Sequence, residues 1–511
     1  MGWISHFTDI NRKYVASTVV RLILIHSLLL GLAGCDPTPG RESAPAPGEI
    51  PSPSASPNPG SPVRTNELQA EPVVPQPEPD PFEEQTEPEP VYRPADNRQI
   101  PDSELLNKLG IHVVESKHIR IYSDLPVEKI ESLPPLVDQL IAVLQEYFGE
   151  LPPDRDGKPF QLSGYVMEDV PLYEKSGLLP PKFAQLEHGR HQGAEFWIVV
   201  PDTDYYLRHL LFHEATHCYM MYMPHTSAPV WYLEGMAELF ATHRLQNEDK
   251  VEFNVFPEES SAYEGFGRIE LIKQDSEKTG LKTIEQVTNL ESGGYHSNIS
   301  YAWAWALCRF FDQHADYQGR FRHFSRQYLR EEPFAELFNT EFEPLANQLN
   351  QEWLSFASEL EYGMEYEQLR IDFTPGRMLA GSTEFTVDSN LGWQNSGWQL
   401  EQGKTYHLEA TGLFELDETT RPWTSTADGI SFDYYRGVPL GQLLGVIRPT
   451  EVENPEQNFC FAQFARFGKQ LTFRAPYNGT LYLRINDRPD QLFNNQGELQ
   501  IRLEEVAADS Q

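Results

Sequence analysis

The spacing of hydrophobic and polar positions changes three times along the chain and divides it into four segments. Residues 1–35 contain one short apolar run, and residues 36–100 show no apolar periodicity. Between 101 and 365, apolar side chains recur mostly at helical spacing, with a few alternating runs. From 370 to 506, short alternating runs between turn residues take over. The pattern predicts a multidomain protein, with an α+β domain followed by an all-β sandwich.

The apolar spacing also places the elements of residues 101–365. Strands are expected at His118–Ser123, Phe160–Met167 and Phe196–Val200. Helices are expected at Leu133–Phe148, Leu207–Met223, Val230–Leu245, 265–277, Ser300–Phe311, Phe321–Leu329, Phe334–Phe338 and Leu345–Leu360. Together they predict a small mixed sheet followed by helices.

Residues 370–506 contain the strand signals of the second domain. Alternating runs lie at Tyr406–Ala410, Leu471–Arg474, Leu481–Ile485 and Leu499–Leu503. A turn signal, Tyr477-Asn478-Gly479, separates the second run from the third. Regular short strands between turns are typical of a sandwich of two sheets.

A disordered tether is expected at residues 36–100. This segment holds 17 of the 40 prolines of the chain, mixed with Ser, Ala, Gly and Glu. Such a composition cannot bury enough apolar surface to offset chain entropy. Proline-rich chains extend by about 3.1 Å per residue, so the tether could reach roughly 200 Å. It would hold the following domains away from their attachment point; a proline-rich ligand for a partner domain is the alternative.

Residues 1–35 are expected to be a targeting segment. Basic residues at positions 12, 13 and 21 precede the apolar run 22–30, and Leu-Ala-Gly-Cys ends the segment at Cys35. The last four residues resemble the bacterial lipobox, which implies cleavage before Cys35 and a diacylglyceryl group on its sulfur. The protein would then be lipid-anchored in the cell envelope, on the periplasmic or surface side. An ordinary signal peptide and an uncleaved anchor are the alternatives.

Charge and cysteine content exclude several classes of protein. The formal net charge of −36 argues against a nucleic-acid partner, because phosphate backbones require basic surfaces. Four cysteines in 511 residues make no disulfide framework. Cys218, Cys308 and Cys460 lie in apolar runs and are expected to be buried thiols, although Cys218 and Cys308 could pair. No apolar stretch after residue 35 is long enough to span a bilayer.

The motif with the clearest chemistry is H-E-x-x-H at residues 213–217. On a helix, His213 and His217 share one face, where both can bind one Zn²⁺, and Glu214 beside them can act as general base. A catalytic zinc also needs a third protein ligand and an open position for water. The next expected helix follows a short break and brings Glu234 beside the two histidines.

H-E-x-x-H followed by W-x-x-E-G-x-A-E, at residues 231–238, resembles the gluzincin metallopeptidases, most closely the bacterial peptidase MA-like group. The resemblance covers about residues 111–360 and implies a zincin-like catalytic domain. It implies that the zinc ligands are His213, His217 and Glu234, and that Glu214 activates the water. Glu238, one turn after Glu234, would support a histidine from behind, and it is also the rival third ligand.

The same resemblance implies two further features of the cleft. The strand 196–200 would border the cleft and pair with an extended substrate. Tyr301, at the start of the helix 300–311, is the first candidate to stabilise the oxyanion, because a similar Tyr-Ala stretch recurs in the peptidase MA-like group. A packing role at the helix start is the alternative for Tyr301. Further candidates are His225, His243 and His296.

A second resemblance lies in the sandwich. Segments 392–403 and 443–447, and above all Asn486-Asp487 followed by Asn494-Asn495, resemble PA-IL-type galactose-binding lectins. The resemblance implies a Ca²⁺ ion held by Asp487, Asn494 and Asn495, which would bridge to a galactose-type glycan. Gln491 departs from the small hydroxyl residue of that family, and residues 423–433 lack its sugar-contacting His and Gln. The alternative is a structural sandwich with Asp and Asn in a tight turn.

The sequence therefore predicts a membrane-anchored zinc metallopeptidase that hydrolyses peptide bonds of a peptide or protein substrate. Its C-terminal sandwich would bind a glycan or calcium. The alternative from another class is a non-catalytic cell-surface lipoprotein that binds glycan and carries a silent zinc domain. The presence of Glu214 together with the ligand set favours the enzyme, because a silent domain has no need of the base.

Overall fold

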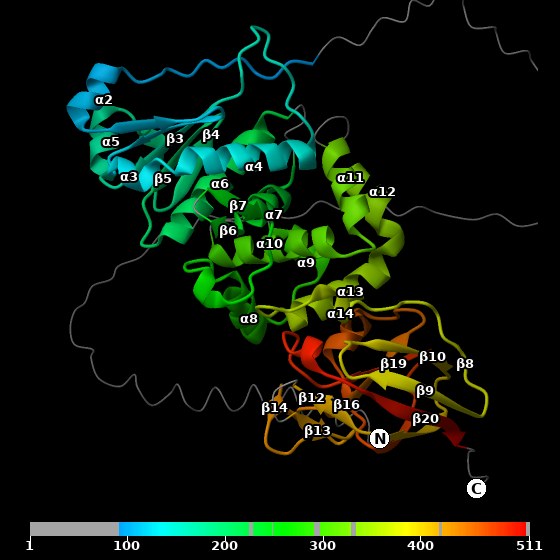
Figure 1. Ribbon diagram of the computed structural model, residues 1–511. Coiled ribbons are helices and arrows are strands. Elements are labelled where there is room, and N and C mark those ends of the chain that lie inside the picture. The colour runs from blue at the N-terminus through cyan, green and yellow to red at the C-terminus, as the bar shows by residue number, and fades with distance from the viewer. Residues whose placement is uncertain are drawn as a thin grey trace, which may run out of the picture. The chain divides into compact units, whose positions relative to one another are not determined.

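A mixed five-stranded sheet opens the described part of the chain (Figure 1). The computed structural model describes residues 91–223, 228–247, 249–290, 297–328, 334–417 and 422–506. The strands are β1 (His112–Glu115), β2 (Ile119–Ser123), β3 (Leu162–Met167), β4 (Gly189–Gln192) and β5 (Glu195–Val199). Their order is β1-β2-β3-β5-β4, with β2, β3 and β5 parallel and both edge strands antiparallel to their neighbours. The small mixed sheet expected from the sequence is confirmed.

The two faces of this sheet bury different side chains because strand residues alternate. One face carries Ile121, Val166 and Ile198 into the main core, which helices α4 and α6 cover. The other face stacks Tyr165 on Trp197, with ring centroids 5.3 Å apart, beneath α2 and α5. Strand β5 is thus buried on both sides.

The helices follow the expected ones closely. The long ones are α4 (Leu133–Phe148), α6 (Asp204–Met221), α7 (Val230–Ala241), α8 (Arg268–Thr279), α10 (Asn298–Gln313), α11 (Gln318–Tyr328), α12 (Phe334–Phe342) and α13 (Ala346–Glu359). The short ones are α2 (Ser103–Leu109), α3 (Val127–Ile130), α5 (Val170–Ser176), α9 (Ile284–Thr288) and α14 (Tyr366–Leu369).

The second expected metal helix was predicted too long. It ends at Ala241, and residues 243–247 form strand β6, which pairs with β7 (Lys250–Phe253). The backbone turns extended at Thr242 (φ −74°, ψ 107°), where the Thr242 carbonyl oxygen accepts a hydrogen bond from the Val255 amide. A hairpin therefore takes over the apolar positions that continued the helical pattern.

Helices α7 and α10 approach closely at Gly235, the residue after Glu234. A Cβ atom at this position would lie 2.5 Å from the Cys308 sulfur and 2.6 Å from the Ala304 carbonyl oxygen. Only glycine fits here without moving backbone. The glycine of the W-x-x-E-G motif thus allows α10 to pack directly behind the glutamate. Cys218, Cys308 and Cys460 are buried free thiols, as expected.

Two facing sheets with a common core form the C-terminal part of the described chain (Figure 1). One sheet has the order β17-β16-β19-β10-β8 and the other β18-β11-β20-β9. Their strands are β8 (Arg377–Met378), β9 (Ser382–Asp388), β10 (Gln394–Leu400), β11 (Thr405–Thr411), β16 (Leu443–Pro449), β17 (Ala465–Arg466), β18 (Gln470–Arg474), β19 (Gly479–Ile485) and β20 (Glu498–Val506). Two hairpins complete this C-terminal part: β12 (Phe414–Leu416) pairs with β13 (Trp423–Ser425), and β14 (Tyr434–Tyr435) pairs with β15 (Val438–Pro439).

Residues from Val91 onward belong to one compact unit, in which buried ionic contacts join α13 to the C-terminal sheets. Glu359 of α13 lies 3.1 Å from Arg484 of β19 and 2.8 Å from Arg436. Removing one member of such a buried group would leave uncompensated charge. The sequence contained no signal for this junction.

The N-terminal segments lie largely outside the described residues. This holds for Cys35 and for the expected tether as far as residue 90. The last part of that tether, 91–100, forms no helix or strand, but Arg98 donates hydrogen bonds to Ser163 and to the carbonyl oxygen of Ala194. The expected tether therefore ends earlier than residue 100. Within the described residues, no helix is both long enough and apolar enough to cross a membrane.

Candidate metal centre

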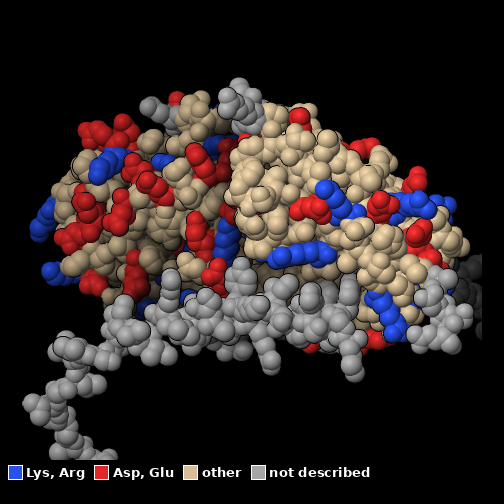
Figure 2. Space-filling model, turned by 90° about the horizontal axis from the view of Figure 1, so that it is seen from below, with Lys and Arg blue, Asp and Glu red and all other residues tan. Residues whose placement is uncertain are grey.

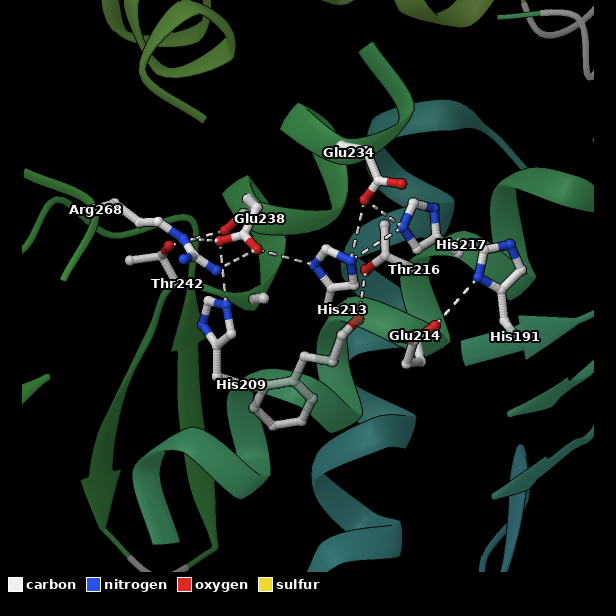
Figure 3. Close-up of polar contacts among 12 residues, drawn as sticks. His191, His209, His213, Glu214, Thr216, His217, Glu234, Glu238, Thr242 and Arg268 are labelled. Carbon is white, nitrogen blue, oxygen red and sulfur yellow. Dashed lines mark hydrogen bonds and ion pairs between the residues drawn. The ribbon is translucent and has the colours of Figure 1, made fainter. Parts of the chain in front are cut away.

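Helices α6 and α7 bring three potential metal ligands together (Figure 3). The Nε2 atoms of His213 and His217 lie 3.1 Å apart. The Oε2 atom of Glu234 lies 3.3 Å from the first and 3.1 Å from the second. The two histidines are buried, and the Glu234 side chain is 17% exposed. The helix–break–helix arrangement thus converges three donor atoms on one point.

These separations fit a single metal ion. Ligand atoms about 2.0–2.1 Å from a tetrahedral ion stand roughly 3.3 Å from one another, close to the three observed distances. The neighbouring carboxylates favour positive charge at His213, whereas burial lowers the pKa of His217. Burial alone would lower the pKa of His213, but its bonds to Glu234 and Glu238 outweigh burial and raise that pKa to about 10. The buried His and Glu groups could therefore hold a metal ion.

Glu238 lies behind His213 rather than at the point of convergence. Its Oε1 atom is 3.3 Å from Nδ1 of His213, and its Oε2 atom is 3.2 Å from Nε2 of His209. Arg268 donates to both carboxylate oxygens, at 2.9 and 3.0 Å. Burial would raise the pKa of Glu238, but the Arg268 charge outweighs it and holds that pKa well below its ordinary value.

The buried ion pair explains why a second group of candidate ligands is less suited to a metal. His209, His213 and Glu238 also lie close enough to share an ion. The guanidinium of Arg268 already supplies the positive charge at this carboxylate. His209 and Arg268 were not found from the sequence. His209 lies one turn before His213, and this helical spacing was the available signal.

The Glu214 carboxylate is held between α6 and the edge strand β4. Its Oε2 atom lies 3.1 Å from Nδ1 of His191, whose ring stacks on that of His217 with centroids 4.4 Å apart. A Cβ atom on Gly189 would come within 2.4 Å of Oε1, so the glycine leaves room for the carboxylate. Burial would raise the pKa of Glu214, but the His191 bond and the charge of His213 outweigh it and lower that pKa.

The strand that borders the cleft is not the one expected from the sequence, and His191, which lies on it, was not among the expected site residues. The strand expected to border the cleft, β5, is internal, and β4 lies outside it at the edge of the sheet. The physical reason is a tight hairpin at Gly193, whose φ of +60° turns the chain back along β5. A four-residue strand of Gly, Arg, His and Gln carries no apolar alternation, so nothing in its pattern revealed it.

Tyr301, in the first turn of α10, lies in the cleft beside the candidate ligands. Its ring centroid is 6.2 Å from that of His213. Burial, and then the negative charge of Glu234, raise the pKa of its hydroxyl, which therefore stays protonated near neutral pH. The cleft has a volume of about 610 Å³, and Tyr301, His213, Glu214 and Gly189 all line it.

The other candidate histidines lie elsewhere. His225 and His296 fall outside the described residues. His243 is buried in the main body, where Nδ1 contacts the Ala241 carbonyl oxygen at 2.8 Å and Nε2 accepts a hydrogen bond from Arg208. Burial lowers the pKa of His243 to about 3. This residue is a satisfied core histidine.

The candidate calcium residues lie between β19 and β20, where Asp487 and Asn495 contact each other. Asp487 is buried; its Oδ2 atom accepts from the Asn495 amide at 2.7 Å and its Oδ1 atom from the Arg488 backbone N–H. Asn494 donates to Gln491, at 3.0 Å. The side-chain oxygens of Asn494 and Asn495 are buried and accept no hydrogen bond from described residues. These two buried oxygens are of the kind that hard cations bind, while both Asp487 oxygens already accept N–H groups.

Comparisons with known proteins show limited similarity. The sequence matches no protein-family model, and no curated protein is similar to it in sequence. The solved structures that resemble part of the chain include the EclA N-terminal domain, a PllA-like lectin, with 18% identity, a TM-score of 0.19, and coverage of 25% of this chain and 97% of that one. Another is PliG of Aeromonas hydrophila, a periplasmic inhibitor of g-type lysozyme, with 7% identity, a TM-score of 0.16, and coverage of 27% and 98%. A designed double-stranded β-helix has 12% identity, a TM-score of 0.11, and coverage of 25% and 100%. At these TM-scores, the similarities assign no family to the chain.

Proposed function

We propose that this chain is a zinc-dependent peptidase with a zincin-like domain at residues 101–365. The observation that carries the proposal is the convergence of two imidazole nitrogens and one carboxylate oxygen within 3.1–3.3 Å of each other, beside Glu214. Two histidines and one carboxylate form a common ligand set of catalytic zinc, which keeps a fourth position open. The resemblance of the two motifs to gluzincins supports the same assignment.

Each surrounding group then has a role in peptide hydrolysis. Bound zinc would supply a Lewis acid that polarises the scissile carbonyl and acidifies water. Glu214 takes the proton of the attacking water and passes it to the leaving amine. His191 holds that carboxylate in position from β4, and Glu238 fixes the ring of His213 through Nδ1. The protonated hydroxyl of Tyr301 donates a hydrogen bond to the oxyanion.

The test is removal and return of the metal. The purified full chain is expected to contain about one zinc per molecule by elemental mass spectrometry. Chelation should stop cleavage of a mixed peptide library, and stoichiometric zinc should restore it, because the three ligands are the only protein groups proposed to hold the ion. Magnesium serves as the control cation, since it prefers oxygen ligands. If the chain held stoichiometric zinc but cleaved no peptide, the proposed peptidase function would be contradicted.

The proposed location is the cell envelope, with the protein anchored by lipid at Cys35. The Leu-Ala-Gly-Cys sequence after an apolar run supports this proposal. The full chain is expected in the membrane fraction of the producing bacterium and should require detergent for release. The Cys35→Ser variant should move to the soluble fraction or keep its uncleaved leader. Equal release of both proteins by high salt would contradict a lipid anchor.

The C-terminal sheets suggest a second candidate function, binding of calcium and, through it, of glycan. The specific observation is the pair of buried side-chain oxygens on Asn494 and Asn495 that lack a hydrogen-bond partner among described residues. Calcium at 100 times its Kd should stabilise the chain by about 2.7 kcal/mol. Asp487→Asn should remove this thermal shift, whereas Asp428→Asn, at an exposed ion pair, should keep it. A thermal shift with calcium, together with no cleavage by the zinc-loaded chain in any assay, would favour a non-catalytic glycan-binding lipoprotein.

A further inference from the structure

The outer part of the cleft carries two cations that the proposed chemistry does not use. Lys182 and Arg190 both line it, and both are exposed. Among the described residues, neither lies within ion-pair distance of a carboxylate; Lys182 contacts the ring of Phe183 at 5.0 Å instead. Charges that line a cleft attract ligands of the opposite sign, so these two cations favour an anionic group on the ligand.

Three cations and three carboxylates line the cleft, and the cations differ in how they are paired. Arg268 neutralises Glu238, and Glu214 serves as the base. The remaining charged groups that line the cleft are the cations Lys182 and Arg190 and one carboxylate, Glu187. The chain as a whole has a net charge of −36, but charges are screened beyond about 8 Å at physiological ionic strength. Lys182 and Arg190 therefore act on a bound substrate at short range, although acidic groups gather on the left part of the face in Figure 2.

Arg190 is placed where an extended substrate would run. Its backbone lies on β4 between Gly189 and His191, which adjoin Glu214, while strand alternation directs its side chain to the other face, opposite Trp197. The Val199 amide donates to the His188 carbonyl oxygen, so the alternating antiparallel pattern leaves the backbone groups of residues 189 and 191 on the open edge.

We propose that the cleft selects peptides with an acidic side chain next to the scissile bond, and that Arg190 and Lys182 determine this preference. The inference rests on the proposed peptidase function and specifies its substrate class. A carboxylate on the substrate would form charge-assisted hydrogen bonds with the guanidinium or ammonium group. An uncharged isostere of the same size would keep the backbone pairing and lose only this contact.

The experiment uses the zinc-loaded full chain and peptides that differ at one position, which holds Glu, Gln or Lys on either side of the cleaved bond. The wild-type kcat/KM is expected to be about fivefold to tenfold higher for Glu than for Gln. Arg190→Gln with Lys182→Gln should equalise kcat/KM for the two peptides, and the readout is this ratio rather than either rate alone. Arg190→Glu should favour the Lys peptide, an inversion that loss of packing cannot produce. Lys469→Gln, on the C-terminal half, is the matched control and should keep the preference.

A binding measurement separates this inference from the proposed function. The Glu214→Gln chain should bind the Glu peptide more tightly than the Gln peptide, and the Arg190→Gln substitution should remove the difference. If this binding difference were found but the wild type cleaved no peptide, the preference for acidic peptides would be supported and the proposed peptidase function overturned. Cleavage or binding that is equal for Glu and Gln peptides in the wild type would overturn the selectivity alone. If none of the peptides bound or was cleaved, both the acidic selectivity and the peptidase function would be overturned.

Discussion

The Glu214→Gln variant is expected to bind zinc normally and to cleave peptides about 10³-fold more slowly than the wild type. Glutamine has the size of glutamate but cannot accept a proton from the attacking water. The surroundings of Glu214 fit the role of a base that is ionised at neutral pH. Burial opposes ionisation, yet the bond to His191 and the charge of His213 lower the pKa of this carboxyl below its ordinary value.

Metal content should not change in this variant, because the Glu214 oxygens are not among the three converging atoms. The measurement pairs zinc per chain with kcat on one cleaved peptide. Glu187→Gln is the matched control, since it removes a carboxylate from the same cleft without contacting the metal position, and it should keep kcat within about twofold. If Glu214→Gln cleaved as fast as this control, another group would be the base.

Local pattern was sufficient for most helices and for the central strands. Leu133–Phe148 was predicted to the residue, because apolar side chains at helical spacing follow two prolines at its start and a glycine with positive φ ends it. Strands β2, β3 and β5 were found because each buries at least one face. The H-E-x-x-H motif located three side chains of the candidate site for the same reason: helical geometry fixes residues four apart on one face.

Interactions between distant segments could not be predicted in this way. His191 reaches Glu214 from a short polar edge strand, and Arg268 reaches Glu238 from α8, which lies 30 residues further along the chain. Neither residue has a neighbour in sequence whose spacing reveals its partner. The helix end at Ala241 was missed because apolar periodicity continued into a hairpin, which forms through pairing with residues 250–253.

The choice between Glu234 and Glu238 as third ligand was also open in the sequence, because both lie on one face of α7. Their environments differ in the structure. Glu234 contacts the Nε2 atoms of both histidines, whereas Glu238 contacts Nδ1 of His213 and is bound on both oxygens by Arg268. A carboxylate already paired with a buried guanidinium is poorly suited to coordinate a metal as well. The geometry therefore assigns different roles to the two glutamates.

The Glu234→Ala variant is accordingly expected to lose zinc, whereas Glu238→Gln should keep it with about 10- to 100-fold weaker affinity. Alanine leaves only the two histidines, too few for a stable site, while glutamine still accepts a hydrogen bond from Nδ1 of His213. The check is zinc per chain after dialysis against buffers of fixed free zinc, with circular dichroism to confirm that both variants fold. The circular dichroism control is needed because Glu238→Gln leaves the buried Arg268 without its counter-charge. This loss costs several kcal/mol of folding stability. Stoichiometric zinc in folded Glu234→Ala, with none in folded Glu238→Gln, would reverse the two roles and place the ion at His209, His213 and Glu238.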